Sequence, residues 1–318
     1  MAQGQNTSSL PNASNSLPAM YSLAEKITSP FGKRLLEQAK MNLVPEDTSL
    51  RVLDCACGIG IISAHLMDML AHGARKNMAL TCLDASEPQI AYLRQRVAEE
   101  GWENVTVVLE DAQVGALASI SASIPLSSGR EMPNFPSPPK DTKLPSASLS
   151  HIFINIGPTF FRSPSAAMKE CRRLLQRGGV VGVSVWKGVG WREDMEAAIQ
   201  SLDDELPFPT LEQLLRIHTS ELGWENTEAL KKTMQKDGFV DVQVTEMAEK
   251  SILADVEEYM LMHSAVMGLI MRFWTLEQRE SWETKASESI EKYMRLKYGS
   301  RPIPWTWEAL LATAQTPA

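Results

Sequence analysis

The chain has 318 residues, of which 44% are hydrophobic and 22% charged, so it is long enough for one large domain or two modest ones. Its formal net charge of −8 argues against a nucleic-acid partner, because phosphate binding depends on clustered Lys and Arg. No apolar run is long enough to span a membrane, and the polar N-terminus lacks the pattern of a secretory signal. We therefore expect a globular, cytoplasmic protein without a membrane or nucleic-acid partner.

The cysteines indicate a reducing compartment and no metal site. Cys55, Cys57, Cys82 and Cys171 lie within apolar or helical patterns, not at the spacings of a disulfide framework. Although Cys55 and Cys57 are close in sequence, no second Cys or His pair lies nearby, so we interpret them as small residues of a strand and its turn.

The first third of the chain alternates between strands and helices. Residues 1–19 are predicted to be a disordered tail, and residues 20–318 a single domain. The segment 20–42 suggests two short helices broken at Ser29-Pro30. Further along we predict strands at 50–55, 78–84 and 104–112, and helices at 61–72 and 87–101. Such alternation favours parallel strands joined by helical crossovers, and therefore an α/β fold.

The alternation is interrupted at residues 114–148, which are dense in Ser and Pro. We predict an exposed, irregular insertion there, mainly disordered. The pattern then resumes, and beyond Trp191 it becomes mainly helical. The expected elements are strands at 149–157, 180–188, 239–247 and 304–315, a helix from Ser163 to Gly178, and helical cap elements at 192–238 and 255–298.

Three aspartates at successive strand ends indicate a ligand. The stretch "VLDCACGIG" delivers Asp54 to the carboxyl end of a strand, and Gly58 and Gly60 allow a tight turn and close backbone approach. Asp84 ends the second strand, where its carboxylate is suited to a ribose diol. Asp111 ends the third strand and is suited to an adenine amine, with the Ala112 and Gln113 backbone alongside.

A dinucleotide fits this pattern poorly. The third glycine position of the G-x-G-x-x-G fingerprint is Ser63, and the first small residue of the loop is Ala56, so the fingerprint fits poorly. The carboxylate of Asp54 also has the wrong sign beside a pyrophosphate but suits a ligand with positive charge. S-adenosylmethionine combines an ammonium and a sulfonium with a ribose diol and an adenine, and it has no phosphate.

From about Tyr21 to Thr316 the chain resembles class I S-adenosylmethionine-dependent methyltransferases, and among them the fungal small-molecule group that includes the gliotoxin bis-thiomethyltransferase. The residues that carry the resemblance are "YSLAEKIT", "VLDCACGIG", "LTCLDAS", "EEGWENV", "EDAQ", "KECRRLLQRGGVVGVSVWKGVGW", "ELPFPT", "KDGFVDVQV" and "RFWTLEQRESWE". The resemblance implies a Rossmann-like, seven-stranded sheet with an antiparallel last strand and helical cap insertions. The 114–148 insertion departs from the family, where we expect a much shorter loop.

The sequence also yields a set of candidate site residues. Those predicted to bind S-adenosylmethionine are Tyr21 (in an expected N-terminal lid), Asp54, Ala56, Cys57, Gly58, Gly60, Asp84, Ala85, Asp111, Ala112, Gln113 and Asn155. Aromatic residues after the fourth and fifth strands favour a hydrophobic or aromatic acceptor. Those predicted to contact it are Phe160, Trp186, Trp191 and His263.

No residue stands out as a general base, so the catalytic residues stay open. His263, in the Met-rich segment "YMLMHSAVMGLIMRFW", is a candidate acid–base group, with core packing as the alternative. We expect methyl transfer to a small-molecule secondary metabolite, with S-methylation of a thiol favoured and O- or N-methylation next. Two alternatives stay open: a cofactor-binding pericyclase-like enzyme that methylates nothing, and a methyltransferase-like regulatory protein.

Overall fold

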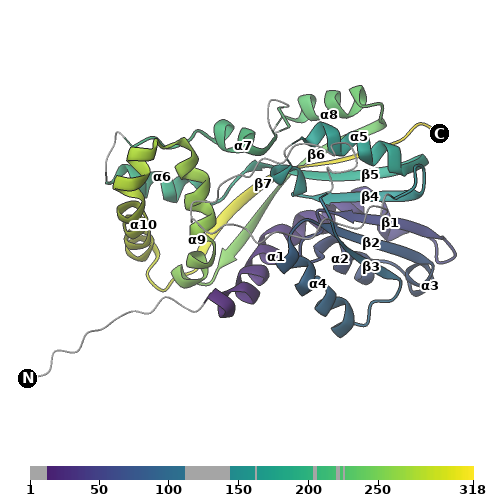
Figure 1. Ribbon diagram of the computed structural model, residues 1–318, viewed down its shortest axis with the longest axis horizontal. Coiled ribbons are helices and arrows are strands. Elements are labelled where there is room, and N and C mark those ends of the chain that lie inside the picture. The colour runs from purple at the N-terminus through teal and green to yellow at the C-terminus, as the bar shows by residue number, and fades with distance from the viewer. Residues whose placement is uncertain (1–12, 112–143, 162, 203–205, 220–222, 225) are drawn as a thin grey trace, which may run out of the picture. The chain divides into compact units, whose positions relative to one another are not determined.

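The computed structural model describes residues 13–111, 144–161, 163–202, 206–219, 223–224 and 226–318 (Figure 1). Within these residues, seven strands form one sheet in the order β3-β2-β1-β4-β5-β7-β6. The strands are β1 Leu50–Cys55, β2 Met78–Asp84, β3 Val105–Leu109, β4 Leu149–Asn155, β5 Leu175–Gly188, β6 Val240–Leu253 and β7 Ile303–Gln315. The helices are α1 Ala13–Gln38, α2 Ile61–Met69, α3 His72–Lys76, α4 Glu87–Glu99, α5 Pro164–Leu174, α6 Arg192–Gln200, α7 Leu211–Thr219, α8 Thr227–Lys236, α9 Val256–Ile270 and α10 Leu276–Tyr298.

The sheet has its topological switch point between β1 and β4. Strands β1, β2 and β3 run parallel to one another, and β4 continues the parallel set on the other side of β1, followed by β5. Asp54 is aligned with Cys82 of β2 and with Phe153 of β4. In such sheets the crevice at the carboxyl ends of the strands beside the switch point is where ligands bind. The last strand is antiparallel, so the Rossmann-like sheet expected from the family resemblance is confirmed.

Two element predictions are wrong, and packing explains both. The helix α1 continues through Pro30 instead of breaking there, because Leu23, Ile27, Phe31 and Leu35 form a buried stripe at i, i+4 spacing that outweighs one lost backbone hydrogen bond. The helix expected to run to Gly178 ends at Leu174, because Leu175 already pairs with Leu149 as the first residue of β5.

The N-terminal tail prediction also needs correction. Helix α1 begins at Ala13, so residues 13–19 are helical, whereas residues 1–12 lie outside the described part of the chain. The predicted insertion at 114–148 lies outside the described residues as far as residue 143. From residue 144 the chain is described, and it leads directly into β4.

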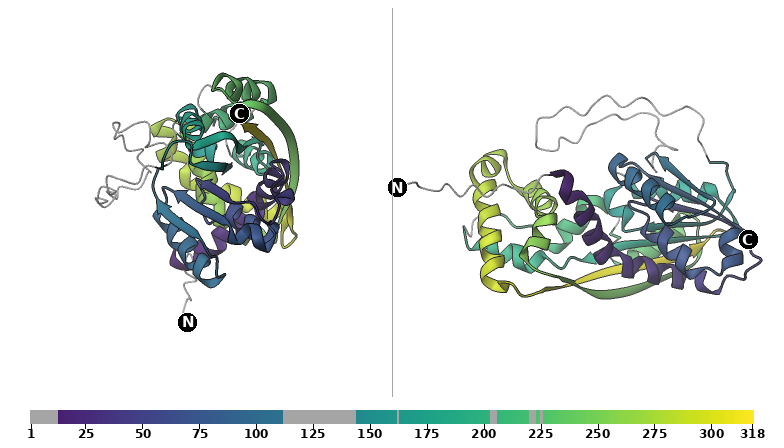
Figure 2. Two further views of the ribbon diagram at one scale, coloured as in Figure 1. Left: turned by 90° about the vertical axis from the view of Figure 1, so that its right-hand side faces the viewer. Right: turned by 90° about the horizontal axis from the view of Figure 1, so that it is seen from below.

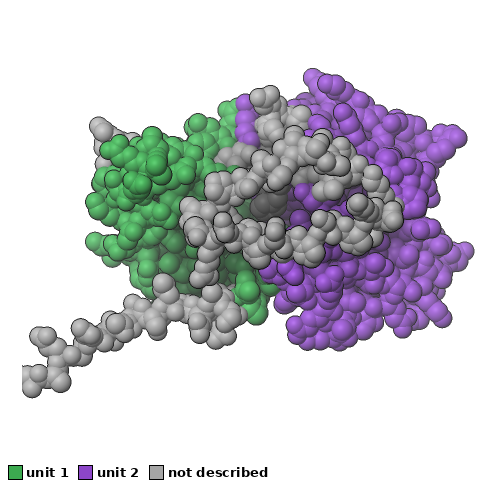
Figure 3. All heavy atoms as spheres, viewed as in Figure 1, with its two compact units in different colours: residues 1–28, 188–214, 249–307 green, residues 29–187, 215–248, 308–318 purple. Residues whose placement is uncertain are grey.

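The chain divides into two compact units, coloured separately in Figure 3. Unit 1 comprises Met1–Thr28, Gly188–Leu214 and Glu249–Trp307, and unit 2 comprises Ser29–Lys187, Leu215–Ala248 and Glu308–Ala318. Within unit 1, α10 packs against α6 and α9, which Figure 2 shows from two further sides. The segment 192–238, expected to be one cap element, is divided: α6 belongs to unit 1 and α8 to unit 2.

The core of unit 2 lies on the sheet. Buried side chains of β1, β4, β5 and β7 pack with those of α5 and α8, including Ile152, Val183 and Leu230. Helix α4 packs against β2 and β3. In the described part of the chain, no helix is long and apolar enough to cross a membrane.

Candidate active site

The loop after β1 has a backbone that suits residues without a large side chain. Ala56, Gly58 and Gly60 all have positive φ, at 54°, 55° and 82°. A β-carbon added to Gly60 would lie 2.5 Å from Leu93 Cδ1 of α4, so a larger residue at this position would displace the Leu93 side chain and also strain the positive φ. Ala56 tolerates its left-handed conformation at a cost of about 1–2 kcal/mol. The result is a strained turn of small residues between β1 and the N-terminus of α2.

Asp54 is buried and hydrogen-bonds to the start of the helix that follows this loop. Its carboxylate is 1% exposed and accepts hydrogen bonds from Ser63 N at 3.1 Å and Ser63 Oγ at 2.6 Å. Burial raises the pKa of Asp54 to about 7, while the two bonds from Ser63 oppose that rise. The carboxylate thus stabilises the first turn of α2. The residue that replaces the third glycine of the fingerprint is therefore its partner.

Asp84 ties the end of β2 to the same loop. Its Oδ2 accepts from Gly58 N and its Oδ1 from Ser86 N, both at 2.8 Å. These bonds fix the carboxylate beside the glycine turn and leave one lone pair on each oxygen for further donors. Ala85 lies between Asp84 and Ser86 in this turn. A fixed carboxylate with spare acceptor positions at a sheet edge suits a diol.

Cys57 contributes its backbone amide to the turn. Its amide donates to Leu83 O at 3.0 Å, which joins the β1 and β2 turns, and its side chain is buried. A hydrogen bond with Cys82, together with burial, raises the pKa of the Cys57 thiol well above its usual range. Among the described residues, no group of three His, Cys, Asp or Glu side chains is placed to hold a metal ion.

The turn after β4 closes the switch point from the other side. Ile156 has a φ of 60°, unusual for a β-branched residue, and its amide donates to Ser184 Oγ at 2.9 Å. The buried Ser184 hydroxyl donates in turn to Asn155 Oδ1 at 2.7 Å. A β-carbon on Gly157 would lie 2.9 Å from Ala56 Cβ, so the strained turns after β1 and β4 are direct neighbours. The predicted Asn155 is therefore part of one edge with Ala56.

The remaining candidates of unit 2 are only partly described. Asp111 follows β3 and is half-buried, whereas Ala112 and Gln113 lie outside the described residues, as does the side chain of Phe160. Trp186, near the end of β5, is half-buried, and its ring meets that of Phe31 edge-on with centroids 5.2 Å apart. Phe31 thus contributes an aromatic wall from α1 that the sequence did not reveal.

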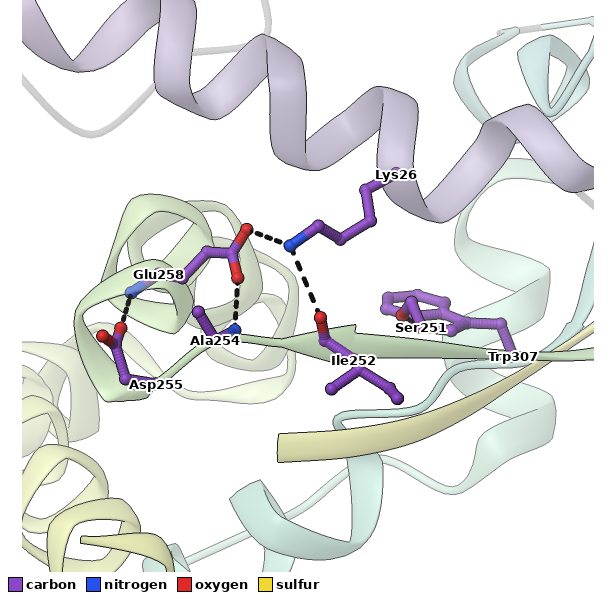
Figure 4. Close-up of polar contacts among 7 residues, drawn as sticks. All are labelled: Lys26, Ser251, Ile252, Ala254, Asp255, Glu258 and Trp307. Carbon is purple, nitrogen blue, oxygen red and sulfur yellow. Dashed lines mark hydrogen bonds and ion pairs between the residues drawn. The ribbon is translucent and has the colours of Figure 1, made fainter. Parts of the chain in front are cut away.

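In unit 1, the N-terminal part of α1 is fixed by polar contacts (Figure 4). Lys26 Nζ donates to Glu258 Oε1 of α9 at 2.5 Å and to Ile252 O at 3.4 Å. Glu258 Oε2 also accepts from Ala254 N at 2.5 Å, and Trp307 Nε1 donates to Ser251 Oγ at 2.7 Å. Tyr21, one turn before Lys26 on the same helix, is 6% exposed. The expected lid segment is thus a helix docked on β6 and α9.

The other acceptor candidates also belong to unit 1. Trp191 precedes α6 and is 3% exposed, and its carbonyl accepts from Met195 N at 3.1 Å. His263 lies on α9 and is 7% exposed. Its Nδ1 is 2.5 Å from the hydroxyl oxygen of Tyr259, a residue that the sequence did not single out although the i, i+4 spacing was readable.

The sequence is similar to those of known methyltransferases. Residues 52–138 match the sequence model of a family described as a methyltransferase domain. The acetylaranotin bis-thiomethyltransferase of Aspergillus terreus is 31% identical over 298 residues, which cover 93% of each chain. Methyltransferase tpcH of Aspergillus fumigatus is 28% identical and covers 93% of this chain and 95% of its own. The solved YcgJ protein of Bacillus subtilis, 12% identical, superposes with a TM-score of 0.48 over 88% of this chain and 97% of its own.

Proposed function

Because the chain belongs to the class I S-adenosylmethionine-dependent methyltransferases, in a group related to fungal secondary-metabolite enzymes, we propose that it methylates a thiol of a small-molecule metabolite. Its methyl donor is S-adenosylmethionine. The observation that carries the thiol assignment is the 31% identity, over 93% of both chains, with an enzyme named for thiol methylation.

The residues at the switch point fit S-adenosylmethionine. The spare lone pairs of Asp84 suit the ribose hydroxyls, and the positive-φ turn at Gly58 and Gly60 lets the ligand lie against backbone. We assign adenine contacts to Asp111, Ala112 and Gln113. The methionine part is assigned to Asn155 and to the Ala56–Cys57 backbone, with Asp54 supporting the loop. Tyr21 is proposed to cover the bound cofactor.

When bound, S-adenosylmethionine supplies a methyl carbon that is already activated by the sulfonium. What the protein adds is orientation of the acceptor sulfur along the line of the breaking bond, together with exclusion of water. A thiol needs less help with its proton than a hydroxyl does, since its pKa of about 8.5 lies close to neutral pH.

For the acceptor we propose a hydrophobic or aromatic small molecule. Trp186 lies near the end of β5 and is half-buried, and we assign acceptor contacts to it and, from the sequence alone, to Phe160 and Trp191. The ring of Trp186, fixed edge-on by Phe31, is preorganised to pack against a flat or apolar ligand. The net charge of −8 supports a small molecule over a nucleic acid as the partner.

The acceptor atom is tested with matched molecules. Three compounds with one aromatic skeleton, carrying a benzylic thiol, alcohol or amine, are incubated with the protein and S-adenosylmethionine, and initial rates are measured by mass spectrometry. We expect kcat/KM for the thiol to exceed that for the alcohol and the amine at least about tenfold. Faster methylation of the alcohol or the amine would reassign the acceptor atom.

A further inference from the structure

Ser184 of β5 is fully buried, and its hydroxyl makes two hydrogen bonds to the end of the neighbouring strand β4. Its Oγ accepts from Ile156 N at 2.9 Å and donates to Asn155 Oδ1 at 2.7 Å. Asn155 is the residue that pairs with Ser184 across the two strands, and it is half-buried, so a ligand can reach it. The hydroxyl therefore contacts the side chain that ends β4 at the switch point.

The hydrogen atoms at Ser184 decide which way the Asn155 amide points. A hydroxyl has one hydrogen to donate, and Ser184 Oγ already accepts a hydrogen from Ile156 N. With Asn155 Oδ1 toward Ser184, the hydroxyl donates and both contacts are hydrogen bonds. With the amide turned over, its NH2 group would be a second donor to the same oxygen, and the buried hydroxyl hydrogen would lose this acceptor. The amide nitrogen therefore faces away from β5.

The amide nitrogen lies beside α1 and the first turn of α2. A β-carbon on Gly32 of α1 would lie 3.2 Å from Asn155 Nδ2 and 3.3 Å from Ile62 Cδ1. Glycine inside a helix is unfavourable relative to alanine, but here it lets α1 approach the amide closely. Gly32, Ile62 and Asn155 belong to unit 2, as do Asp84 and the strained turn at Ala56. The amide and the proposed cofactor residues at the switch point are therefore parts of one compact unit.

The groups around this nitrogen favour an anion. The NH2 group of an amide can only donate, and the N-terminus of the nine-residue helix α2 carries the positive end of its dipole. The negative charge of Asp54 in the same turn is reduced, because burial raises its pKa to about 7 and Ser63 donates to it twice. The single anionic group of S-adenosylmethionine is the α-carboxylate of its methionine part.

We propose that Asn155 binds the α-carboxylate of the cofactor through its amide NH2, and that Ser184 is the positioning residue that keeps this NH2 turned toward it. The inference rests on the proposed function, in which Asn155 contacts the methionine part, and it names the group contacted. The amide carries two hydrogens, and one of them is enough for this bond. The opposite assignment, in which the amide oxygen accepts from the α-ammonium, would take that oxygen away from the Ser184 hydroxyl.

The two assignments predict opposite effects of one added charge. Asn155→Asp keeps the shape of the side chain and an oxygen for the Ser184 hydroxyl, but it replaces the NH2 by a second carboxylate oxygen. We expect the Kd for S-adenosylhomocysteine, measured by calorimetry at neutral pH, to rise about 30-fold or more, because the two carboxylates then repel each other. Methylthioadenosine has the same adenosine and thioether but no amino-acid part. Its Kd should change less than about twofold.

Ser184→Ala tests the positioning role. It removes the hydroxyl that orients the amide, so the NH2 faces the carboxylate only part of the time. We expect the Kd for S-adenosylhomocysteine to rise about 5- to 10-fold and that for methylthioadenosine to stay the same. Ser150→Ala is the matched control, because this serine bonds to Arg51 N and O at the amino end of β4, far along the strand from Asn155. It should leave both Kd values unchanged.

Binding of methylthioadenosine verifies that each variant is folded. A Kd for S-adenosylhomocysteine that falls or stays the same in Asn155→Asp would overturn the inference, and a fall would reassign Asn155 to the ammonium. Equal losses for both molecules would show a structural role only. Should Asn155→Asp fail to fold, Ser184→Ala decides alone. If the unaltered protein binds neither molecule, the cofactor assignment fails, and the proposed function fails with it.

Discussion

Substitution of Asp84 tests the proposed cofactor site. Replacing Asp84 by Asn keeps the shape of the side chain but removes its charge and one of its two acceptor atoms. The amide oxygen can accept from either Gly58 N or Ser86 N, both now bonded at 2.8 Å, but not from both. One backbone N–H then faces an NH2 group, which should lower the free energy of unfolding by about 1–3 kcal/mol.

The larger effect is expected on cofactor binding. A hydrogen bond to a charged acceptor contributes about 1.5–3 kcal/mol, against about 0.5–1.5 kcal/mol for a neutral pair. Two ribose hydroxyls that donate to Asp84 would therefore lose about 2–3 kcal/mol together. This corresponds to a rise of about 30- to 150-fold in the Kd for S-adenosylhomocysteine.

Calorimetric titration measures this change directly. The control is Asp68→Asn, which removes the same charge from an exposed position on α2. We expect Asp68→Asn to bind S-adenosylhomocysteine as the unaltered protein does. A Kd for Asp84→Asn within about twofold of the control would refute the assignment of Asp84 to the ribose.

Three further predictions concern stability, each measured by chemical denaturation. Gly60→Ala should lower the free energy of unfolding by about 2–4 kcal/mol, because the added β-carbon would lie 2.5 Å from Leu93 Cδ1 and φ is 82°. The control Gly101→Ala, where φ is 64° and nothing lies within 4 Å, should lower it by only about 1–2 kcal/mol. Equal losses in the two variants would contradict a clash at Gly60. Burial raises the pKa of Asp54 to about 7, so the folded state binds more protons than the unfolded chain between about pH 4 and pH 7, and this group's contribution to stability falls as the pH rises through that window. Burial lowers the pKa of His151 to about 4, so its contribution to stability changes with pH in the opposite direction. The test is therefore the difference in free energy of unfolding between the unaltered protein and Asp54→Asn, which should fall as the pH rises. A difference that does not change with pH would show that Asp54 is charged throughout. Glu258→Gln should lower the free energy of unfolding by about 1–2 kcal/mol, because it weakens the hydrogen bonds from both Lys26 Nζ and Ala254 N. The control Glu257→Gln breaks an exposed ion pair with Arg295 and should lower it by less than about 1 kcal/mol. A larger loss in Glu257→Gln would show that the contact between Lys26 and Glu258 does not stabilise the fold.

The sheet, and the aspartates at its edge, could be predicted from the sequence because they follow local rules. Short apolar strand patterns with an acidic residue at or near each carboxyl end predict Asp54, Asp84 and Asp111 at one edge of the sheet. The glycine turn could also be predicted, because glycine adopts positive φ without steric strain, as Gly58 and Gly60 do.

The features that the sequence did not predict depend on contacts between residues that are distant along the chain. The helix α1 passes through Pro30 because its buried stripe outweighs a local breaker. In the sequence, Ser63 only departs from the glycine fingerprint. In the structure, its hydroxyl donates a hydrogen bond to the carboxylate of Asp54. Tyr259 and His263 are four residues apart and could have been paired, whereas the contact of Tyr259 with Met195 spans 64 residues and has no local signature.

We propose that this chain consumes S-adenosylmethionine in methylating a thiol. The most direct test uses S-adenosylmethionine with a deuterated methyl group and the benzylic thiol as acceptor, and counts both products by mass spectrometry. We predict one S-adenosylhomocysteine formed for each trideuteromethyl group found on sulfur. A protein that binds the cofactor but leaves it unconsumed, or that places the label on oxygen or nitrogen when those acceptors compete, would contradict the account.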